Sequence, residues 1–142
     1  MNSSQQFCTF FLDGLFFGVE VEKVQEVIRQ QHTTRVPLAQ QVIGGLINLR
    51  GQIVTAVDLR RRLELPEREQ GQVPMNVVVR TDEGAVSLLV DEIGDVVEVE
   101  ENQFERPPDT LQGVARDLIR GAYKLQGTLL LSIDTDRALK AA

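Results

Sequence analysis

The chain has 142 residues, 42% of them hydrophobic and 25% charged, a composition typical of a domain that can bury a core. Its 21 acidic residues outnumber the 15 basic ones, and the net charge of −6 argues against a nucleic-acid or anionic-membrane binder. One cysteine and one histidine exclude a disulfide framework and a Cys/His zinc cluster, and leave one imidazole for proton transfer. No apolar run is long enough to span a bilayer and no basic signal region begins the chain, so we expect a cytoplasmic protein, and a binding protein rather than an enzyme.

Apolar residues in the first part of the chain alternate in short runs separated by turn signals, which predicts strands. A hairpin is expected over residues 7–21, with an Asp-Gly dipeptide at its turn. The apolar spacing over residues 21–28 changes to three and four, which predicts one or two helical turns. A second short helix is expected after Pro37.

The next elements repeat the pattern of strands followed by a helix. A hairpin is predicted over residues 46–57. Asp58 is well placed to cap a short helix over residues 59–65. The polar residues 67–74 have no periodicity and are interpreted as an exposed linker.

Past the linker, the same order of elements recurs. Strands are predicted over residues 77–80 and 85–90, and two prolines at 107–108 break the chain. A hairpin over residues 119–133 precedes a terminal helix capped by Asp134.

This recurrence is an internal repeat. Residues 45–64 laid on residues 121–140, an offset of 121 − 45 = 76, share six of twenty positions, including the turn glycine and the helix cap. A weaker match sets residues 21–28 beside residues 90–97, an offset of 90 − 21 = 69. We therefore predict two similar β-rich subdomains in one globule, with a seam between them as the place for a binding surface.

The repeats differ at one hairpin tip, where Arg50 stands opposite Gln126. An arginine there can present its planar fork to a carboxylate of a partner or of Glu26, although a solvated turn arginine is the simpler interpretation. Val24 and Ile93 occupy equivalent positions and either line an apolar groove at the seam or belong to the core.

Other candidate groups have simple structural interpretations. The ten acidic residues between positions 82 and 109 are interpreted as a solvent-exposed face rather than a metal site. The three arginines at residues 60–62 are interpreted as a solvent-exposed helix face, and His32 is interpreted as a surface residue. Cys8 is expected to be reduced and to act as a small core residue.

Four segments in this order resemble the CheW family, the adaptors of bacterial chemotaxis arrays: FFGVEVEKVQEVI, GLINLRGQIVTAVDLR, VSLLVDEIGDV and LQGTLLLSID. The similarity runs from about Phe7 to Leu139. It implies a mainly β fold of two SH3-like five-stranded β-barrels packed together, with a few short helices including a C-terminal one. The chain would be a single CheW-like domain over residues 5–140, with two pseudo-repeat subdomains at roughly 15–75 and 76–140 and strands near the termini open to exchange.

The resemblance also implies a role. Such a protein is a non-catalytic adaptor between the cytoplasmic tips of chemoreceptors, the methyl-accepting chemotaxis proteins, and the regulatory domain of the histidine kinase CheA. It would need no cofactor or metal, bind no nucleic acid, and stay in the cytoplasm beside membrane-bound receptor arrays without inserting into the membrane. The alternatives left open are a small-barrel nucleic-acid-binding protein and, behind it, an enzyme that uses His32.

The family's hairpin and groove carry over to particular residues. The receptor-binding groove implied by the resemblance contains Val24, Glu26, Gly45, Leu46, Asn48, Leu49, Arg50, Gly51 and Ile93. Glu26 matches the acid that pairs with the hairpin arginine in the family. No kinase-contacting residue is assigned, because residues 102–110 depart from the family pattern, and the receptors and motility output served stay open.

Overall fold

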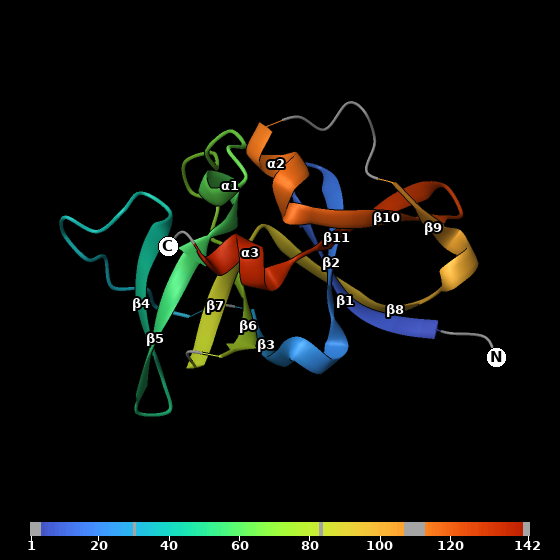
Figure 1. Ribbon diagram of the computed structural model, residues 1–142. Coiled ribbons are helices and arrows are strands. Elements are labelled where there is room, and N and C mark those ends of the chain that lie inside the picture. The colour runs from blue at the N-terminus through green and yellow to red at the C-terminus, as the bar shows by residue number, and fades with distance from the viewer. Residues whose placement is uncertain (1–3, 30, 83, 107–112, 141–142) are drawn as a thin grey trace.

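The computed structural model describes residues 4–29, 31–82, 84–106 and 113–140, whose strands form two sheets joined by short helices (Figure 1). Sheet A has the strand order β8-β1-β2-β11-β10-β9, and sheet B has the order β3-β6-β7-β5-β4. Sheet A contains β1 (Ser4–Leu12), β2 (Leu15–Glu20), β8 (Glu92–Glu100), β9 (Phe104–Glu105), β10 (Ile119–Leu125) and β11 (Thr128–Ile133). Sheet B contains β3 (Val24–Ile28), β4 (Ile43–Leu49), β5 (Gln52–Asp58), β6 (Met75–Thr81) and β7 (Gly84–Val90). The helices are η1 (Val21–Lys23), α1 (Leu59–Arg62), η2 (Glu101–Gln103), α2 (Gly113–Leu118) and α3 (Thr135–Lys140).

The mainly β class with short helices, including a C-terminal one, is confirmed. The predicted hairpins are present as β1–β2, β4–β5, β6–β7 and β10–β11. The sheets have six and five strands, because β9 adds to the edge of sheet A. Among the described residues, no strand pairing closes either sheet into a barrel.

The longer repeat corresponds to one structural unit that occurs twice. The unit β4-β5-α1 has the same order as β10-β11-α3, and each hairpin has its register shift at the matching place, between Ile43 and Gly45 or between Ile119 and Gly121. Asp58 caps α1 by accepting a hydrogen bond from the amide of Arg60 at 3.0 Å. The repeated residues therefore specify the same turn and the same helix start in both sheets.

The chain crosses between the sheets at two matching points. β3 follows β2 of sheet A but pairs with β6 of sheet B, and β8 follows β7 of sheet B but pairs with β1 of sheet A. Phe10 pairs with Ile93 in sheet A, as Val79 pairs with Val24 in sheet B. Each sheet thus takes strands from both parts of the sequence, while the division into two pseudo-repeat subdomains stays a prediction.

Alternating side chains of the strands supply three apolar clusters. In β1, Phe10 and Leu12 enter a central cluster that both sheets share, and Phe7 enters a smaller cluster belonging to sheet A. Sheet B has its own cluster, made by Ile47, Leu49, Val54, Ala56, Val78 and Leu89. The shared central cluster joins the sheets into one body, because neither sheet can bury that face alone.

A buried ionic network lies where the chain passes from β7 to β8. Asp91 accepts hydrogen bonds from Arg60 Nε at 2.9 and 3.1 Å, from Arg68 Nε at 3.1 Å and from the amide of Asp13 at 2.8 Å. Arg60 is 7% exposed and Asp91 8%. Burial alone would raise the pKa of Asp91, but the hydrogen bonds from Arg60 and Asp13 and the charges of Arg60 and Arg68 hold that pKa below its usual value.

This network corrects two sequence-based interpretations. Arg60 is buried and is not part of a soluble helix face. Residues 67–74 have no regular secondary structure, as predicted, but Arg68 is not exposed, because it pairs with Asp58 and Asp91. A long side chain in a loop can turn back to buried acids, which local sequence does not reveal.

The two helices predicted from the sequence before β4 are largely absent from the structure, so both predictions are largely wrong. Only Val21–Lys23 forms a short 3-10 turn, and residues 24–28 form β3, where three β-branched residues favour a strand. After Pro37 the chain makes turns, and Leu38 is fully exposed, so a helix there would have no apolar face to bury. The helix over residues 59–65 is shorter than predicted and ends at Arg62. The prolines at 107–108 lie outside the described residues.

We predict that Asp91→Asn lowers the free energy of unfolding by about 3 kcal/mol, because it leaves the guanidinium of Arg60 buried without its carboxylate. Urea unfolding followed by circular dichroism measures the loss. Asp95→Asn is the matched control, since Asp95 is an exposed acid on β8, the strand that follows Asp91, and it should change stability little. Equal effects of the two substitutions would contradict the role of the network.

The same network predicts an acid-dependent loss of stability. Since the pKa of Asp91 is lower in the folded protein than in the unfolded chain, its contribution is present above about pH 4 and is lost as the pH falls through the folded-state pKa. Unfolding measured from pH 6 to pH 2 should show a steeper fall for the natural chain than for Asp91→Asn. Parallel curves would contradict the prediction.

Candidate functional site

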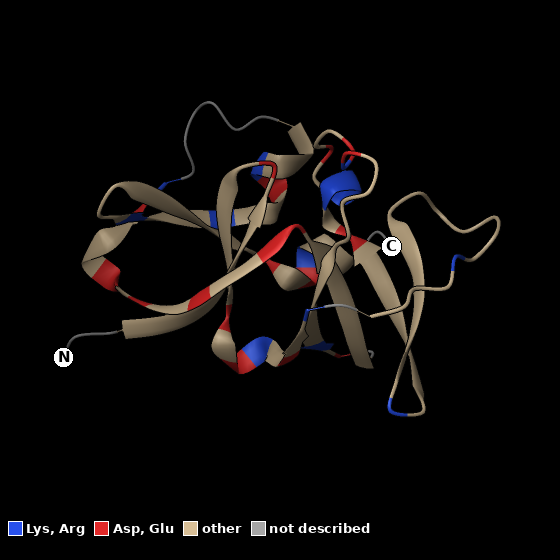
Figure 2. Cartoon of the chain, turned by 180° about the vertical axis from the view of Figure 1, so that it is seen from behind, with Lys and Arg blue, Asp and Glu red and all other residues tan. Residues whose placement is uncertain are grey.

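The β4–β5 hairpin projects from sheet B and carries a basic tip (Figure 2). Arg50 and Gly51 have φ angles of 52° and 89°, the left-handed conformation that a two-residue hairpin turn requires. Asn48 Oδ1 accepts a hydrogen bond from the amide of Gly51 at 2.8 Å and closes the turn. The Asn-Leu-Arg-Gly sequence therefore folds into a fixed turn that presents the side chain of Arg50.

Arg50 forms a two-pronged ion pair with Glu26 of β3. Arg50 Nη1 donates to Glu26 Oε1 at 3.0 Å, and Nη2 donates to Oε2. The hydrogen bonding between the two side chains lowers the pKa of Glu26 and raises the pKa of Arg50. The side chain of Arg50 is still 69% exposed, against 24% for Glu26. The pair orients the guanidinium and leaves most of its surface open to a partner.

Residues 31–34 run along β4 and were missed as part of the site. The amide of Thr34 donates to the carbonyl of Leu46 at 2.8 Å, and the amide of Leu46 donates back at the same distance. Gln31 Nε2 donates to the carbonyl of Asn48 at 2.9 Å. The sequence suggested only a polar surface here, and two adjacent β-branched threonines were the one signal of extended chain.

Gly45 makes this close approach possible. A Cβ atom at position 45 would lie 2.4 Å from the carbonyl oxygen of Thr34, and Gly45 has a φ of 147°. Only glycine fits both the backbone conformation and the space.

The remaining predicted site residues lie in different environments. Leu49 is 6% exposed and belongs to the core cluster of sheet B, so its role is structural. Val24 begins β3 in sheet B, whereas Ile93 lies on β8 in sheet A. Both are half-buried against the shared central core.

The structure thus brings most of the predicted set together on one side of sheet B. Glu26, Asn48, Arg50 and Gly51 meet directly, and Gly45 and Leu46 follow along β4. Ile93 belongs to the other sheet, on its edge strand β8. Like Val24, which is on the edge strand β3 of sheet B, it packs against the central core. Receptor binding by this set stays a prediction.

The described residues show no group of three or more His, Cys, Asp or Glu side chains that could hold a metal ion. His32 is exposed. Cys8 is half-buried, and burial raises the pKa of its thiol. In the part of the chain that the structure describes, no helix is both long enough and apolar enough to cross a membrane.

Comparisons with known proteins agree on one family. The family model described as CheW-like domain matches residues 6–142. The chemotaxis protein CheW of Bacillus subtilis is 31% identical over 139 residues, which cover 98% of this chain and 89% of that protein. The chemotaxis protein CheW of Thermotoga maritima is 29% identical over 135 residues, covering 93% and 85%. The crystal structure of the scaffolding protein TtCheW from Thermoanaerobacter tengcongensis superposes with a TM-score of 0.82 at 25% identity, covering 93% of this chain and 90% of that one.

We predict that Gly45→Ala forces residues 31–34 away from β4 and lowers the free energy of unfolding by about 1–3 kcal/mol. Urea unfolding measures the change, and faster amide hydrogen exchange at Leu46 would report the lost bridge. The matched control is Gly71→Ala, which also has a positive φ but meets no atom within 4 Å. If the two substitutions destabilise equally, the contact with Thr34 does not require the glycine.

Proposed function

Because this chain belongs to the family of CheW-like domains, it is a non-catalytic chemotaxis scaffold, and we propose that it couples the cytoplasmic tips of chemoreceptors to the regulatory domain of the histidine kinase CheA. The protein acts in the cytoplasm beside membrane-bound receptor arrays. The single observation that supports the receptor site best is the ion pair of Arg50 and Glu26 at the projecting hairpin.

The receptor tip, a helical segment, lays apolar side chains against Val24, Leu46 and Ile93, which lie on the edge strands β3, β4 and β8. All three are only half-buried and can lose further surface on binding. Arg50 fixes the orientation, since its guanidinium is held by Glu26 and can also meet polar groups of the receptor. Binding needs no covalent chemistry, and a shift at the receptor contact can bias the kinase contact.

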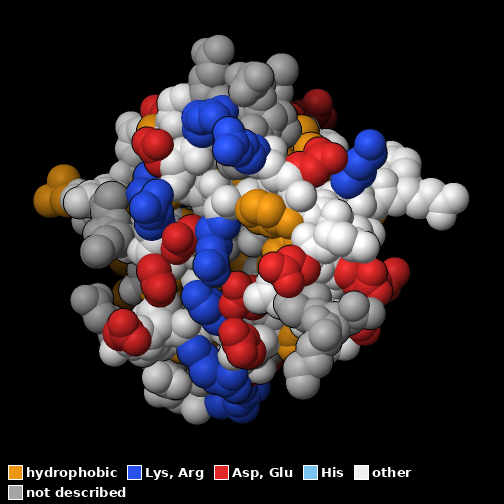
Figure 3. Space-filling view, turned by 45° about the vertical axis from the view of Figure 1, so that its right-hand side comes forward, with side chains coloured by type: hydrophobic (Ala, Val, Ile, Leu, Met, Phe, Trp, Pro, Cys, Tyr) orange, Lys and Arg blue, Asp and Glu red, His pale blue; other side chains and the backbone are white. Residues whose placement is uncertain are grey.

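No observation favours the nucleic-acid alternative. Acidic side chains are interspersed with basic ones on the face shown in Figure 3, where a nucleic-acid site would need a continuous basic groove with stacking aromatics. Tyr123, the single tyrosine of the chain, lies beside acidic residues.

We predict that Arg50→Glu weakens binding to a chemoreceptor cytoplasmic fragment by about tenfold or more, because it reverses the charge at the tip and repels Glu26. Co-sedimentation with the fragment measures binding, and the melting temperature should stay nearly unchanged because the pair is exposed. Arg106→Glu is the control, since Arg106 is exposed and lies beyond β9 of the other sheet. Unchanged binding, or an unfolded variant, would contradict the assignment of the groove.

The adaptor role predicts a ternary complex. The chain, a CheA-type kinase and a receptor cytoplasmic fragment should co-elute in size-exclusion chromatography at micromolar concentrations. Ile93→Arg should remove the receptor from the complex but leave the kinase bound, because the receptor is proposed to cover Ile93 on β8. Failure of the natural chain to form the complex would contradict the adaptor role.

A further inference from the structure

A hollow of about 480 Å³ lies at the end of sheet A that contains β9. In Figure 1, β9 and the β4–β5 hairpin lie on opposite sides of the molecule. It is lined by Gln5, Val99, Glu100, Glu101, Phe104 and Tyr123. None of these residues belongs to the site described above. The lining combines aromatic rings with carboxylates, which is the chemistry of a site for a cation.

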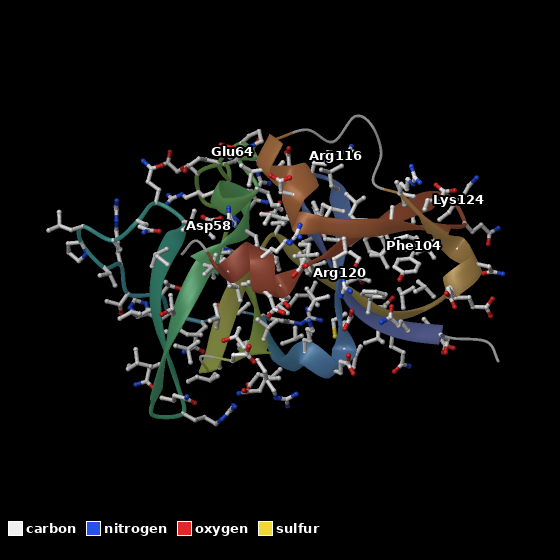
Figure 4. All side chains as sticks on the ribbon, viewed as in Figure 1. Asp58, Glu64, Phe104, Arg116, Arg120 and Lys124 are labelled. Atoms are coloured by element: carbon white, nitrogen blue, oxygen red, sulfur yellow. The ribbon has the colours of Figure 1, made fainter. Side chains whose placement is uncertain are left out.

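Three aromatic rings lead from the core to this hollow. Phe7 is buried, and its ring centroid lies 5.4 Å from that of Tyr123. Phe104 meets Tyr123 edge to face, again at 5.4 Å, and remains 47% exposed (Figure 4). The outer ring therefore rests on a packed support and still presents surface to solvent.

Gly121 leaves room on β10 for the exposed ring of Phe104. A Cβ atom at Gly121 would lie 2.2 Å from Cε2 of Phe104, so the ring occupies the space that a side chain on β10 would fill. The hydroxyl of Tyr123 donates to Gln5 Oε1 at 3.2 Å, which fixes the second ring. The two rings are thus preorganised before any partner binds.

In the described part of the chain, no basic side chain forms an ion pair with the carboxylates beside the rings. Glu100 caps η2 by accepting a hydrogen bond from the backbone of Gln103. Within the described ranges, neither Glu100 nor Glu101 forms an ion pair. Arg120 is already bound to Glu20 at 3.0 Å, and Lys124 follows Tyr123 on β10, so its side chain points to the opposite side of the strand (Figure 4).

We propose that this hollow binds an arginine side chain of a partner protein. The planar guanidinium stacks on Phe104 and directs its N–H groups to Glu101. Arginine fits better than lysine, because a compact and strongly hydrated ammonium cannot use a ring face and a carboxylate together as well as a flat fork can. This surface is separate from the receptor groove, so it does not depend on the adaptor role.

The test is a titration of the full-length ¹⁵N-labelled chain, followed by NMR. The probe is Nα-acetyl-arginine N-methylamide, and the matched probe is the citrulline analogue, which has the same shape without the charge. The arginine probe should shift the amide signals of Phe104, Gly121 and Tyr123 and saturate with a Kd on the order of millimolar, as expected for a single side chain. The citrulline probe should bind at least about fivefold more weakly.

Three variants complete the test. Glu101→Gln and Phe104→Ala should each raise the Kd about fivefold or more. Glu98→Gln removes an exposed charge on β8, the strand before η2, outside the hollow, and should leave the Kd within about twofold. Glu101→Gln alters no packing contact, so its result stands even if Phe104→Ala is poorly folded. A third probe, Nα-acetyl-lysine N-methylamide, should bind more weakly than the arginine probe. The proposal would be overturned if either the citrulline or the lysine probe bound as tightly as the arginine probe, or if the shifts did not map to this hollow.

Discussion

The carboxylate of Asp91 holds together three segments at the point where the chain leaves one sheet for the other. It binds Arg60 after β5, Arg68 in the loop before β6, and the backbone of the β1–β2 turn. Because β8 begins at the next residue, the position of Ile93 depends on this network. At the matching crossover from β2 to β3, Glu20 pairs with Arg120 at 3.0 Å and Lys23 contacts Asp136 at 3.9 Å, and both pairs are more exposed than the pair of Arg60 and Asp91. The buried ionic network therefore lies at one of the two crossovers, and the other has more exposed ion pairs.

Local signals in the sequence predict local structure well in this protein. Turn glycines and the cap at Asp58 depend on neighbouring residues, so the hairpins and α1 follow from the sequence. The buried role of Arg60 and the bridge of Thr34 to β4 depend on residues far away in the chain, and nothing nearby encodes them. Arg50 was found because one repeat could be compared with the other, whereas the placement of Ile93 in the other sheet requires the strand order.

The repeated scaffold separates what the fold needs from what binding needs. Both hairpins have a glycine at the tip and an acid at the start of the following helix, yet only the first presents an arginine held by a carboxylate. Sheet A, which contains the second hairpin, instead has β9 at its edge, where the exposed Phe104 lies beside Glu100 and Glu101. One architecture thus displays two chemically different surfaces at opposite ends of the molecule.

The crossing of strands between the sheets also affects how the chain can acquire its structure. The β1–β2 hairpin is synthesised before the strands that flank it, which are β8, through Phe10 and Ile93, and β11, through Phe17 and Leu131. Its β1 edge therefore remains uncovered until β8 has been synthesised, and its β2 edge until β11 near the end of the described chain. Such long-range pairing favours slow, late and cooperative folding, and leaves the emerging hairpin dependent on protection from aggregation.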